Sequence, residues 1–275
     1  HKANQRSTRS FFCGGIMSHL RAKPIALITG ASRRIGIGAA IALSLAQAGW
    51  DIATTFWQHY DETMPWGSNP VDVAWLEQQL TALGAKTMAL NADLSLIETP
   101  TQLFDAVEQR LGPVSALILS HCQSVDSNIF NTTVESFDRH FAINARATWL
   151  LVREFGLRFP KVNATYPDRQ GRIIALTSDH VVENLPYGAS KGALDRIVLA
   201  ATHEFRHLGI TANVINPGAT DTGWMTDELK RQVSQETPGG RVGLPEDCAN
   251  LVAFLCSPAG GWINGQLLYS NGGSK

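Results

Sequence analysis

Cysteine and charge are both scarce in this chain of 275 residues, in which charged residues make up 17%. None of the four cysteines forms a C-x-x-C pair or a cluster with zinc-ligand spacing, which favours a reducing, cytoplasmic setting without a bound metal. The formal net charge of -1 gives no reason to expect a nucleic-acid partner. No apolar run approaches the ~18 residues of a membrane span. The remaining expectation is a small neutral or anionic ligand held by local groups.

The amino terminus does not resemble the rest of the chain. Residues 1–16 are polar and basic apart from a brief apolar stretch, which is too short for a secretory signal. Met17 is a plausible natural start, so we place residues 1–16 outside the fold. We expect residues 17–275 to form one domain, because no repeat or linker divides them.

Hydrophobic periodicity alternates between strand-like and helix-like segments. The strand-like runs are residues 24–29, 50–56, 86–90, 114–119, 172–177, 210–215 and 266–269. The helical patterns are residues 35–48, 71–83, 100–110, 134–159, 187–207 and 245–255, the fourth ending at Pro160. Continuous apolar strands that alternate with helices predict an α/β fold, a doubly wound parallel sheet of Rossmann type with helices on both faces.

A glycine-rich turn joins the first strand to the first helix, in residues 29–38 (TGASRRIGIG). Gly30 permits a tight turn, and Gly36 or Gly38 lets the helix pack close to the strand. Backbone N–H groups at such a helix start face a phosphate, so the turn predicts dinucleotide binding.

A Tyr-x-x-x-Lys pair opens the helix near residue 187. The spacing puts the Tyr187 phenol and the Lys191 ammonium on one helical face. The ordinary phenol pKa near 10 is too high for a base at neutral pH, and we expect the neighbouring cation to lower it. Ser178 and Asn144 lie at expected strand ends, which makes a chance pair a poor explanation.

Together these residues resemble the short-chain dehydrogenase/reductase family over roughly residues 24–273. The similarity rests on the glycine turn, Asp93-Leu94, Asn144, Ser178, Tyr187 with Lys191, Pro217-Gly218, and the tail residues 265–266 and 271–273. The resemblance implies hydride transfer between a nicotinamide cofactor and a carbonyl or alcohol carbon. It also implies a homo-oligomer, either a dimer or a tetramer.

The resemblance assigns roles to four catalytic residues. Tyr187 would donate the proton in reduction and accept it in oxidation. Lys191 would hold the nicotinamide ribose, Ser178 would polarise the substrate carbonyl, and Asn144 would anchor a water in the proton relay.

The same resemblance implies a cofactor-binding set. Asp93 and Leu94 would contact the adenine, while Pro217, Gly218 and Thr222 would position the nicotinamide. The full set is Gly30, Ser32, Arg33, Arg34, Ile35, Gly36, Asp93, Leu94, Ser120, Tyr187, Lys191, Pro217, Gly218 and Thr222.

Three features depart from the common family pattern. Arg34 replaces the middle glycine of the turn, a variant similar to pteridine-reductase-like and some ketoreductase members. After the fourth strand, Leu119-Ser120-His121-Cys122 replaces the family's Asn-Asn-Ala-Gly. This change removes an asparagine whose side chain braces the strand through hydrogen bonds. It also places the Cys122 thiol where the family has a glycine that lets the backbone approach the cofactor closely. Only nine positions separate Ser178 from Tyr187, so Asp179 or His180 could share the role of the serine.

Cofactor choice depends on the end of the second strand. A carboxylate there would bind the ribose 2′-hydroxyl and repel a 2′-phosphate, but Phe56 and Trp57 occupy the position. Arg33 and Arg34 supply guanidinium groups for a phosphate nearby, unless they point into solvent. NADP(H) is therefore expected in preference to NAD(H).

Other segments allow more than one interpretation. We interpret residues 219–240 as a mobile substrate lid, whereas residues 60–70 could cover the adenosine or form an ordinary surface insertion. His203 and His207 have zinc-compatible spacing but no third ligand, and a covalent role for His121 and Cys122 is not favoured.

The alternative to a carbonyl reductase is a dinucleotide-binding sensor that has lost turnover. The sequence does not determine which carbonyl compound is the substrate: oxoacyl thioesters, sugar-like ketones, pterin-like rings and xenobiotic carbonyls are all compatible with it.

Overall fold

The computed structural model describes residues 22–165 and 170–274, so the expected extension 1–16 and the start at Met17 lie outside the described residues. Its framework is a seven-stranded parallel sheet with the strand order β3-β2-β1-β4-β5-β6-β7. The strands are β1 (Ile25–Thr29), β2 (Asp51–Phe56), β3 (Thr87–Asn91), β4 (Ala116–Leu119), β5 (Gly171–Leu176), β6 (Ile210–Asn216) and β7 (Leu267–Tyr269). The expected single-domain α/β fold of Rossmann type is confirmed.

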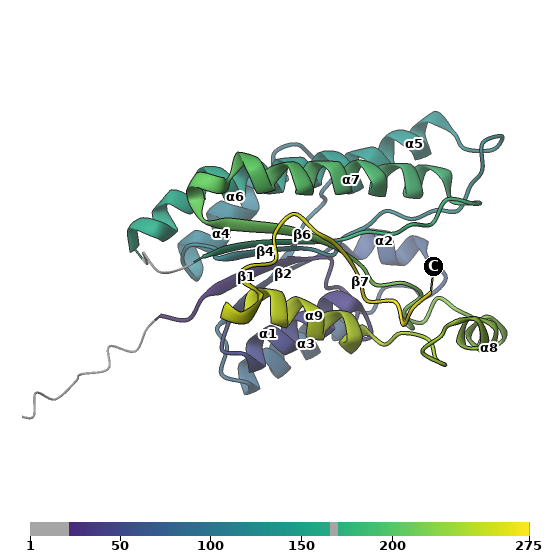
Figure 1. Cartoon of the computed structure of the whole chain (residues 1–275), viewed down its shortest axis with the longest axis horizontal. Helices are drawn as coiled ribbons and strands as arrows, with labels where there is room; N and C mark the ends of the chain where they lie inside the picture. Colours follow the sequence, from purple (N-terminus) through teal and green to yellow (C-terminus); the bar gives the residue numbers. More distant parts are fainter. Residues whose placement is uncertain (1–21, 166–169, 275) are drawn as a thin grey trace, which may run out of the picture.

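Helices cover both faces of the sheet (Figure 1). One layer contains α4 (Thr99–Arg110), α5 (Val134–His140), α6 (Ala147–Thr165) and α7 (Leu185–Glu204), and the other contains α1 (Ile37–Gln47), α3 (Pro70–Ala82) and α9 (Pro245–Cys256). A separate hydrophobic cluster lies under each layer, and this is why the central strands are buried on both faces and rich in continuous apolar sequence.

The order of the strands reverses beside β1. That strand pairs with β2 on one side and with β4 on the other, so the chain leaves the carboxyl ends of β1 and β4 in opposite directions. A crevice forms at such a switch point, and ligands of open α/β sheets bind there. The glycine-rich turn and the loop after β4 both lie at this point.

The long helical pattern of residues 134–159 differs from its prediction in two ways. It is divided by a π-helical turn, Phe141–Arg146, between α5 and α6. Pro160 does not end α6, which continues to Thr165. Phe159 and Val162 are buried beside the proline, and Asn163 Nδ2 donates to the carbonyl of Leu208 (3.0 Å), so packing of the last turn offsets the missing N–H donor.

Two short helices lie off the carboxyl ends of the strands, where the sequence was interpreted as loop (Figure 1). The first, α2 (Gln58–Thr63), overlaps the segment 60–70 that follows β2, and the second, α8 (Asp227–Glu236), lies inside the expected lid. Thr226 caps α8, since its side chain accepts from the N–H of Leu229 (3.2 Å).

Candidate active site at the carboxyl ends of the strands

The first turn of α7 brings Tyr187 close to the loop that follows β5. A Cβ on Gly188 would lie only 2.1 Å from the carbonyl oxygen of His180, so the absence of a side chain there permits this approach. The short spacing between Ser178 and Tyr187 is compatible with direct contact for this reason. The Ser178 hydroxyl accepts from the N–H of His180 (3.1 Å) and lies close enough to the Tyr187 phenol to affect its pKa.

The pKa of Tyr187 moves in the direction opposite to the expected one. Burial raises it well above the ordinary phenol value, the Cys122 thiol adds to the rise, and the neighbouring Ser178 hydroxyl opposes it. Lys191 Nζ lies 5.8 Å from the centre of the Tyr187 ring, and burial remains the largest influence on the phenol. The phenol is therefore protonated at neutral pH.

Lys191 is almost fully buried, with 2% of its surface exposed. Its Nζ donates to the carbonyl of Leu176 at the end of β5 (2.8 Å), which uses one of its three hydrogens. Burial lowers the pKa of this ammonium, while Cys122 and Asp195 act in the opposite direction. The side chain is thus directed at the carboxyl end of β5, beside Tyr187.

Asn144 lies in the π-helical turn and is fully buried. Its Oδ1 accepts from the N–H of Gln123 (2.7 Å), and its Nδ2 donates to the carbonyl of Gln123 and to Ser190 Oγ (both 2.9 Å). The side chain thereby ties the loop after β4 to the helix that carries Tyr187. Its backbone carbonyl accepts from Thr148 Oγ1 (2.8 Å).

The glycine-rich turn packs tightly against the rest of the crevice. Gly30 has a φ of +73°, and a Cβ there would lie 2.7 Å from the backbone nitrogen of His121. A Cβ on Gly38 would lie 2.6 Å from the carbonyl oxygen of Gly30, so α1 can approach β1 only without side chains at these positions. Gly36, at the start of α1, has no side-chain cap. The turn has the form that a phosphate-binding loop requires.

The two arginines of the turn have different surroundings. Arg34 is held by Asp72 of α3, which accepts from the Arg34 N–H (3.1 Å) and lies 3.6 Å from Nε. Arg33 stacks over Trp66, with 4.5 Å between its Cζ and the ring centre. Ser32 and Ile35 complete the turn, and Ile35 is half exposed.

His121, after β4, has a structural role that the sequence did not reveal. Its Nδ1 lies 2.7 Å from Thr29 Oγ1 and its Nε2 lies 3.0 Å from the carbonyl of Ile143, so it joins β1 to the π-helical turn. Burial lowers its pKa to about 3 and raises that of the Cys122 thiol. A neutral imidazole and a protonated thiol do not form an activated nucleophile pair.

The other expected cofactor residues border the same crevice. Ser120 donates its N–H to Thr29 Oγ1 (3.2 Å), and Asp93 Oδ1 accepts from the N–H of Ser95 (2.8 Å). Leu94 is buried in the core, which leaves its backbone rather than its side chain for contact with a ligand.

The loop after β6 carries the remaining three residues of the cofactor set. Gly218, which follows Pro217, has a φ of +64° and lies against Asn271 of the carboxyl-terminal tail. Thr222 donates its N–H to the carbonyl of Thr220 (3.0 Å) at the start of the expected lid.

Three residues beside the crevice belong to the segment 60–70, for which the sequence left open a cover over the adenosine or an ordinary insertion, and none of them was assigned to the site. Tyr60 and Asp61 belong to α2, and Trp66 follows that helix. The Tyr60 hydroxyl donates to the carbonyl of Ser124 (3.3 Å), and Trp66 Nε1 donates to Asp61 Oδ1 (3.0 Å). The aromatic residues of this segment are the signal that favours the first of these two interpretations.

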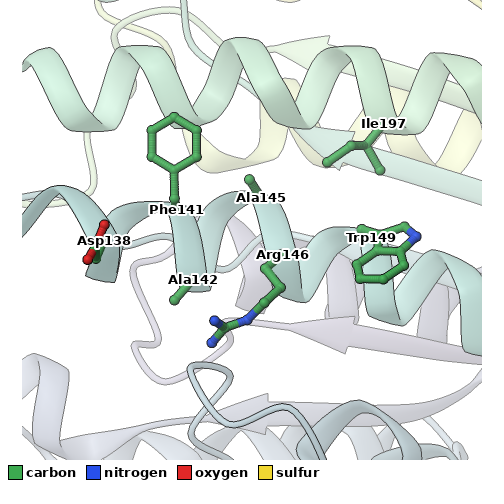
Figure 2. A pocket seen from close by; sticks show the side chains of 7 residues that line it. All are labelled: Asp138, Phe141, Ala142, Ala145, Arg146, Trp149 and Ile197. Carbon is green, nitrogen blue, oxygen red and sulfur yellow. The ribbon is translucent and has the colours of Figure 1, made fainter.

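A cavity bordered by the helices of one layer lies outside this site. It has a volume of about 500 Å³ and is lined by residues of α5, the π-helical turn, α6 and α7, as Figure 2 shows: Asp138, Phe141, Ala142, Ala145, Arg146, Trp149 and Ile197. In residues 22–165 and 170–274, no three His, Cys, Asp or Glu side chains gather as metal ligands would. Within the same ranges, no helix combines the length and apolar character needed to cross a bilayer.

Comparisons with known proteins agree with this geometry. A family model described as enoyl-(acyl carrier protein) reductase matches residues 30–275. An uncharacterized oxidoreductase of Bacillus subtilis, YjdA, is 38% identical over 94% of this chain and 98% of its own length.

Two plant proteins and one solved structure are also similar. A short-chain type dehydrogenase/reductase of Picea abies is 31% identical, with 90% of this chain and 91% of the relative covered. An NADPH-dependent aldehyde reductase-like protein of Arabidopsis thaliana is 32% identical over 90% of this chain and 93% of its own length. The structure of angucycline C-6 ketoreductase LanV with bound NADP matches with a TM-score of 0.77 and 30% identity, over 91% of this chain and 95% of that one. The chain belongs to the short-chain dehydrogenase/reductase family of oxidoreductases.

Proposed function

We propose that this oxidoreductase reduces a carbonyl group with NADPH, or catalyses the reverse oxidation of an alcohol, with Tyr187 as the proton donor. The observation that carries the proposal is Tyr187 with the Ser178 hydroxyl and the buried Lys191 next to it. When bound, the nicotinamide supplies or accepts the hydride. Burial keeps the proton on the phenol, since it raises the pKa of Tyr187, and a protonated phenol is the form that reduction requires.

The neighbouring side chains divide the remaining tasks. Ser178 polarises the substrate carbonyl, because its hydroxyl faces the phenol that would protonate the same oxygen. The N–H groups of Lys191 that do not bind Leu176 would hold the ribose hydroxyls. Asn144 positions the loop after β4 through its two bonds to Gln123, and its place in the proton relay remains part of the proposal.

The preference for NADP(H) is supported by Arg33. Its guanidinium lies at the turn where a 2′-phosphate would be held, while Arg34 is already paired with Asp72. The Arabidopsis relative is named as NADPH-dependent, and the LanV structure contains NADP. Dissociation constants for NADPH and NADH test this part, and tighter binding of NADH would refute it.

We also infer that the protein is an intracellular homo-oligomer. The described cysteines Cys122, Cys248 and Cys256 carry free thiols, which agrees with a reducing compartment. The apolar surface of α6 around Trp149, which is half exposed, is the candidate contact between subunits.

Activity is tested by NADPH oxidation over a panel of ketones, aldehydes, diketones, oxoacyl thioesters and quinonoid rings. We expect turnover on at least one class, and a loss of about 10²–10⁴-fold in kcat/KM for Tyr187→Phe. Unchanged turnover in that variant would show that Tyr187 is not the acid. Tight NADPH binding without turnover on any carbonyl would favour a dinucleotide-binding sensor.

A further inference from the structure

The turn between β4 and α5 holds two large apolar side chains in water. Ile129 is 76% exposed and Phe130 is 96% exposed. Hydrogen bonds fix the turn that presents them. Asn128 Oδ1 accepts from the N–H of Phe130 (3.0 Å), and Thr132 Oγ1 donates to the carbonyl of Asn128 (2.7 Å). An ordered turn that keeps two such side chains in water indicates a binding surface.

This turn is attached to the start of α7, the helix that carries Tyr187. Ser127 forms a β-bridge with Asn184, and its carbonyl accepts from the N–H of Leu185 (2.9 Å). The carbonyl of Asn184 accepts in turn from the N–H of Gly188, in the first turn of α7 (3.0 Å). A continuous series of bonds therefore joins the apolar turn to the catalytic end of the crevice.

The loop between β5 and α7 adds exposed apolar residues to the same region. Val181 and Val182 are both exposed, and each lies within three positions of Asn184, just as Ile129 and Phe130 lie within three positions of its partner in the bridge. Figure 1 shows α5 and α8 at the same end of the molecule, and the expected lid, which contains α8, carries the half-exposed Trp224. Three segments thus offer apolar side chains to a ligand at this end.

The same three segments offer no cation that is free of a carboxylate. Residues 120–133 and 178–186 contain neither lysine nor arginine. The two cations of the expected lid are paired within it: Lys230 with Asp221 (2.9 Å) and Arg231 with Glu228. The first cation after the loop that follows β4 is Arg139, which stacks on Trp57 at the end of β2.

Carboxylates, in contrast, are exposed in this region. Asp126 lies in the loop after β4, and Asp179 and Glu183 lie in the loop after β5. Proteins bind carboxylates and phosphates through arginine and lysine, which these loops lack. An anionic substrate would meet like charges there, whereas a neutral apolar one would cover side chains that are otherwise in water.

We propose that Tyr187 acts on neutral apolar ketones or aldehydes, and that the apolar group of the substrate packs against Ile129, Phe130 and Val182. The inference rests on the proposed function, because it names the substrate class of that same site. Apolar surface of both partners leaves water when they meet, and an aromatic ring contributes the largest area. Carboxylated ketones and oxoacyl thioesters of phosphate-bearing carriers are poor substrates, since no side chain of these segments can neutralise them.

Two ketones that differ only in charge test the substrate class. The methyl ester of para-acetylphenylpropanoic acid is neutral, whereas the free acid is a carboxylate at neutral pH, and two methylene groups separate this difference from the ketone. We expect kcat/KM for NADPH oxidation to be at least about tenfold higher with the ester. Equal or higher kcat/KM with the acid would overturn the inference and leave the proposed function intact. Absence of turnover on every carbonyl, neutral or charged, would overturn both.

Phe130→Ser removes the most exposed side chain of the turn. We expect the KM of the ester to rise about tenfold with little change in kcat. The matched control is Trp262→Ser, because Trp262 is 97% exposed but lies near the start of β5, where a Cβ on the adjacent Gly261 would be 3.3 Å from an Arg172 nitrogen. That variant should keep the wild-type KM. An unchanged KM in Phe130→Ser, or a fall in its oligomeric mass instead, would show that the turn does not bind the substrate.

Glu183→Lys tests the contribution of charge. A cation at this position should raise the ratio of kcat/KM for the acid to kcat/KM for the ester by at least about threefold. Glu204→Lys makes the same change at an exposed residue at the other end of α7, and should leave the ratio as it is. The same ratio in Glu183→Lys and in the wild type would contradict the assignment of charge selection to these loops.

Discussion

His121 is a buried side chain whose protonation state is determined by its two partners. The carbonyl of Ile143 can only accept, so Nε2 carries the hydrogen and Nδ1 accepts from the Thr29 hydroxyl. A second proton would place a buried charge near the Lys191 ammonium. The pKa of His121 is accordingly lowered to about 3. Burial is the larger cause of this shift, and the charge of Lys191 is the second.

This shift predicts a dependence of stability on pH. In the unfolded chain the imidazole binds a proton below about pH 6.5, whereas in the native state it does so only near pH 3. The stabilising contribution of the neutral imidazole is therefore complete above pH 6.5, and it is lost as the pH falls from about 6.5 towards 3. Between pH 7 and pH 5, the free energy of unfolding should fall for both the wild type and His121→Gln. The fall in His121→Gln should be about 2 kcal/mol smaller than the fall in the wild type. Urea denaturation at the two pH values measures the difference.

The matched control is His203→Gln, since His203 is exposed at the end of α7. That variant should retain the pH dependence of the wild type. Parallel losses of stability in the wild type and in His121→Gln would mean that the imidazole is accessible to protons in the native state.

At the same scale, the sequence predicted that Tyr187 and Lys191 lie on one face of a helix but predicted the wrong direction for the phenol pKa. Helical spacing places two residues on one face, and this local rule held. The direction in which Lys191 Nζ points depends on the Leu176 carbonyl of β5, 15 positions away, and the burial of the phenol depends on how α7 packs on the sheet. Neither effect can be derived from a pair of residues on one helix.

The segment expected to form the lid, residues 219–240, closely approaches side chains of the glycine turn. Gly223 has a φ of +84°, and a Cβ there would lie 2.8 Å from Ile35 Cδ1 and 3.2 Å from an Arg33 nitrogen. Trp224 Nε1 donates to the carbonyl of Thr220 (3.1 Å), which holds the start of the segment in a turn. We therefore expect the lid to close on the turn through Gly223.

Two glycine variants separate this contact from backbone strain. Gly223→Ala and Gly240→Ala both place a side chain on a left-handed residue, at a cost of about 1–2 kcal/mol, but Gly240 has no neighbour within 4 Å. Only Gly223→Ala should release the lid, so we expect limited proteolysis within residues 222–236 to be at least about threefold faster than in Gly240→Ala. Equal cleavage rates would show that the contact does not restrain the lid.

The elements that the sequence missed share a physical cause. Residues 58–63 form a helix too short to show periodicity, and it is held by tertiary contacts such as the bond from Tyr60 to Ser124. The π-helical turn in residues 141–146 leaves the apolar pattern intact, so it was hidden inside one long predicted helix. The strands were recognised because burial on both faces produces continuous apolar runs, which need no knowledge of the partner strand.

The molecule as a whole presents different surfaces on its two helical layers. On the layer of α5, α6 and α7, Trp149 and Leu157 of α6 are exposed, and the cavity of about 500 Å³ in Figure 2 lies beside Trp149. Phe141 and Ile197, from adjacent helical segments, line the same hollow. Exposure of this large apolar side chain to water is unfavourable in a monomer. We therefore place a subunit contact there.

Trp149→Glu should therefore weaken association of the subunits. In a symmetric dimer each substituted residue would face the same apolar surface of its partner, so one change introduces two buried charges without counter-ions. We expect the mass from light scattering coupled to size-exclusion chromatography to fall to half that of the wild type. Val71→Glu adds the same charge at an exposed apolar residue of α3, on the opposite layer, and should leave the mass unchanged. A Trp149→Glu protein that keeps the wild-type mass would place the subunit contact on another surface, because a dimer through α6 cannot accommodate two unpaired carboxylates at its centre.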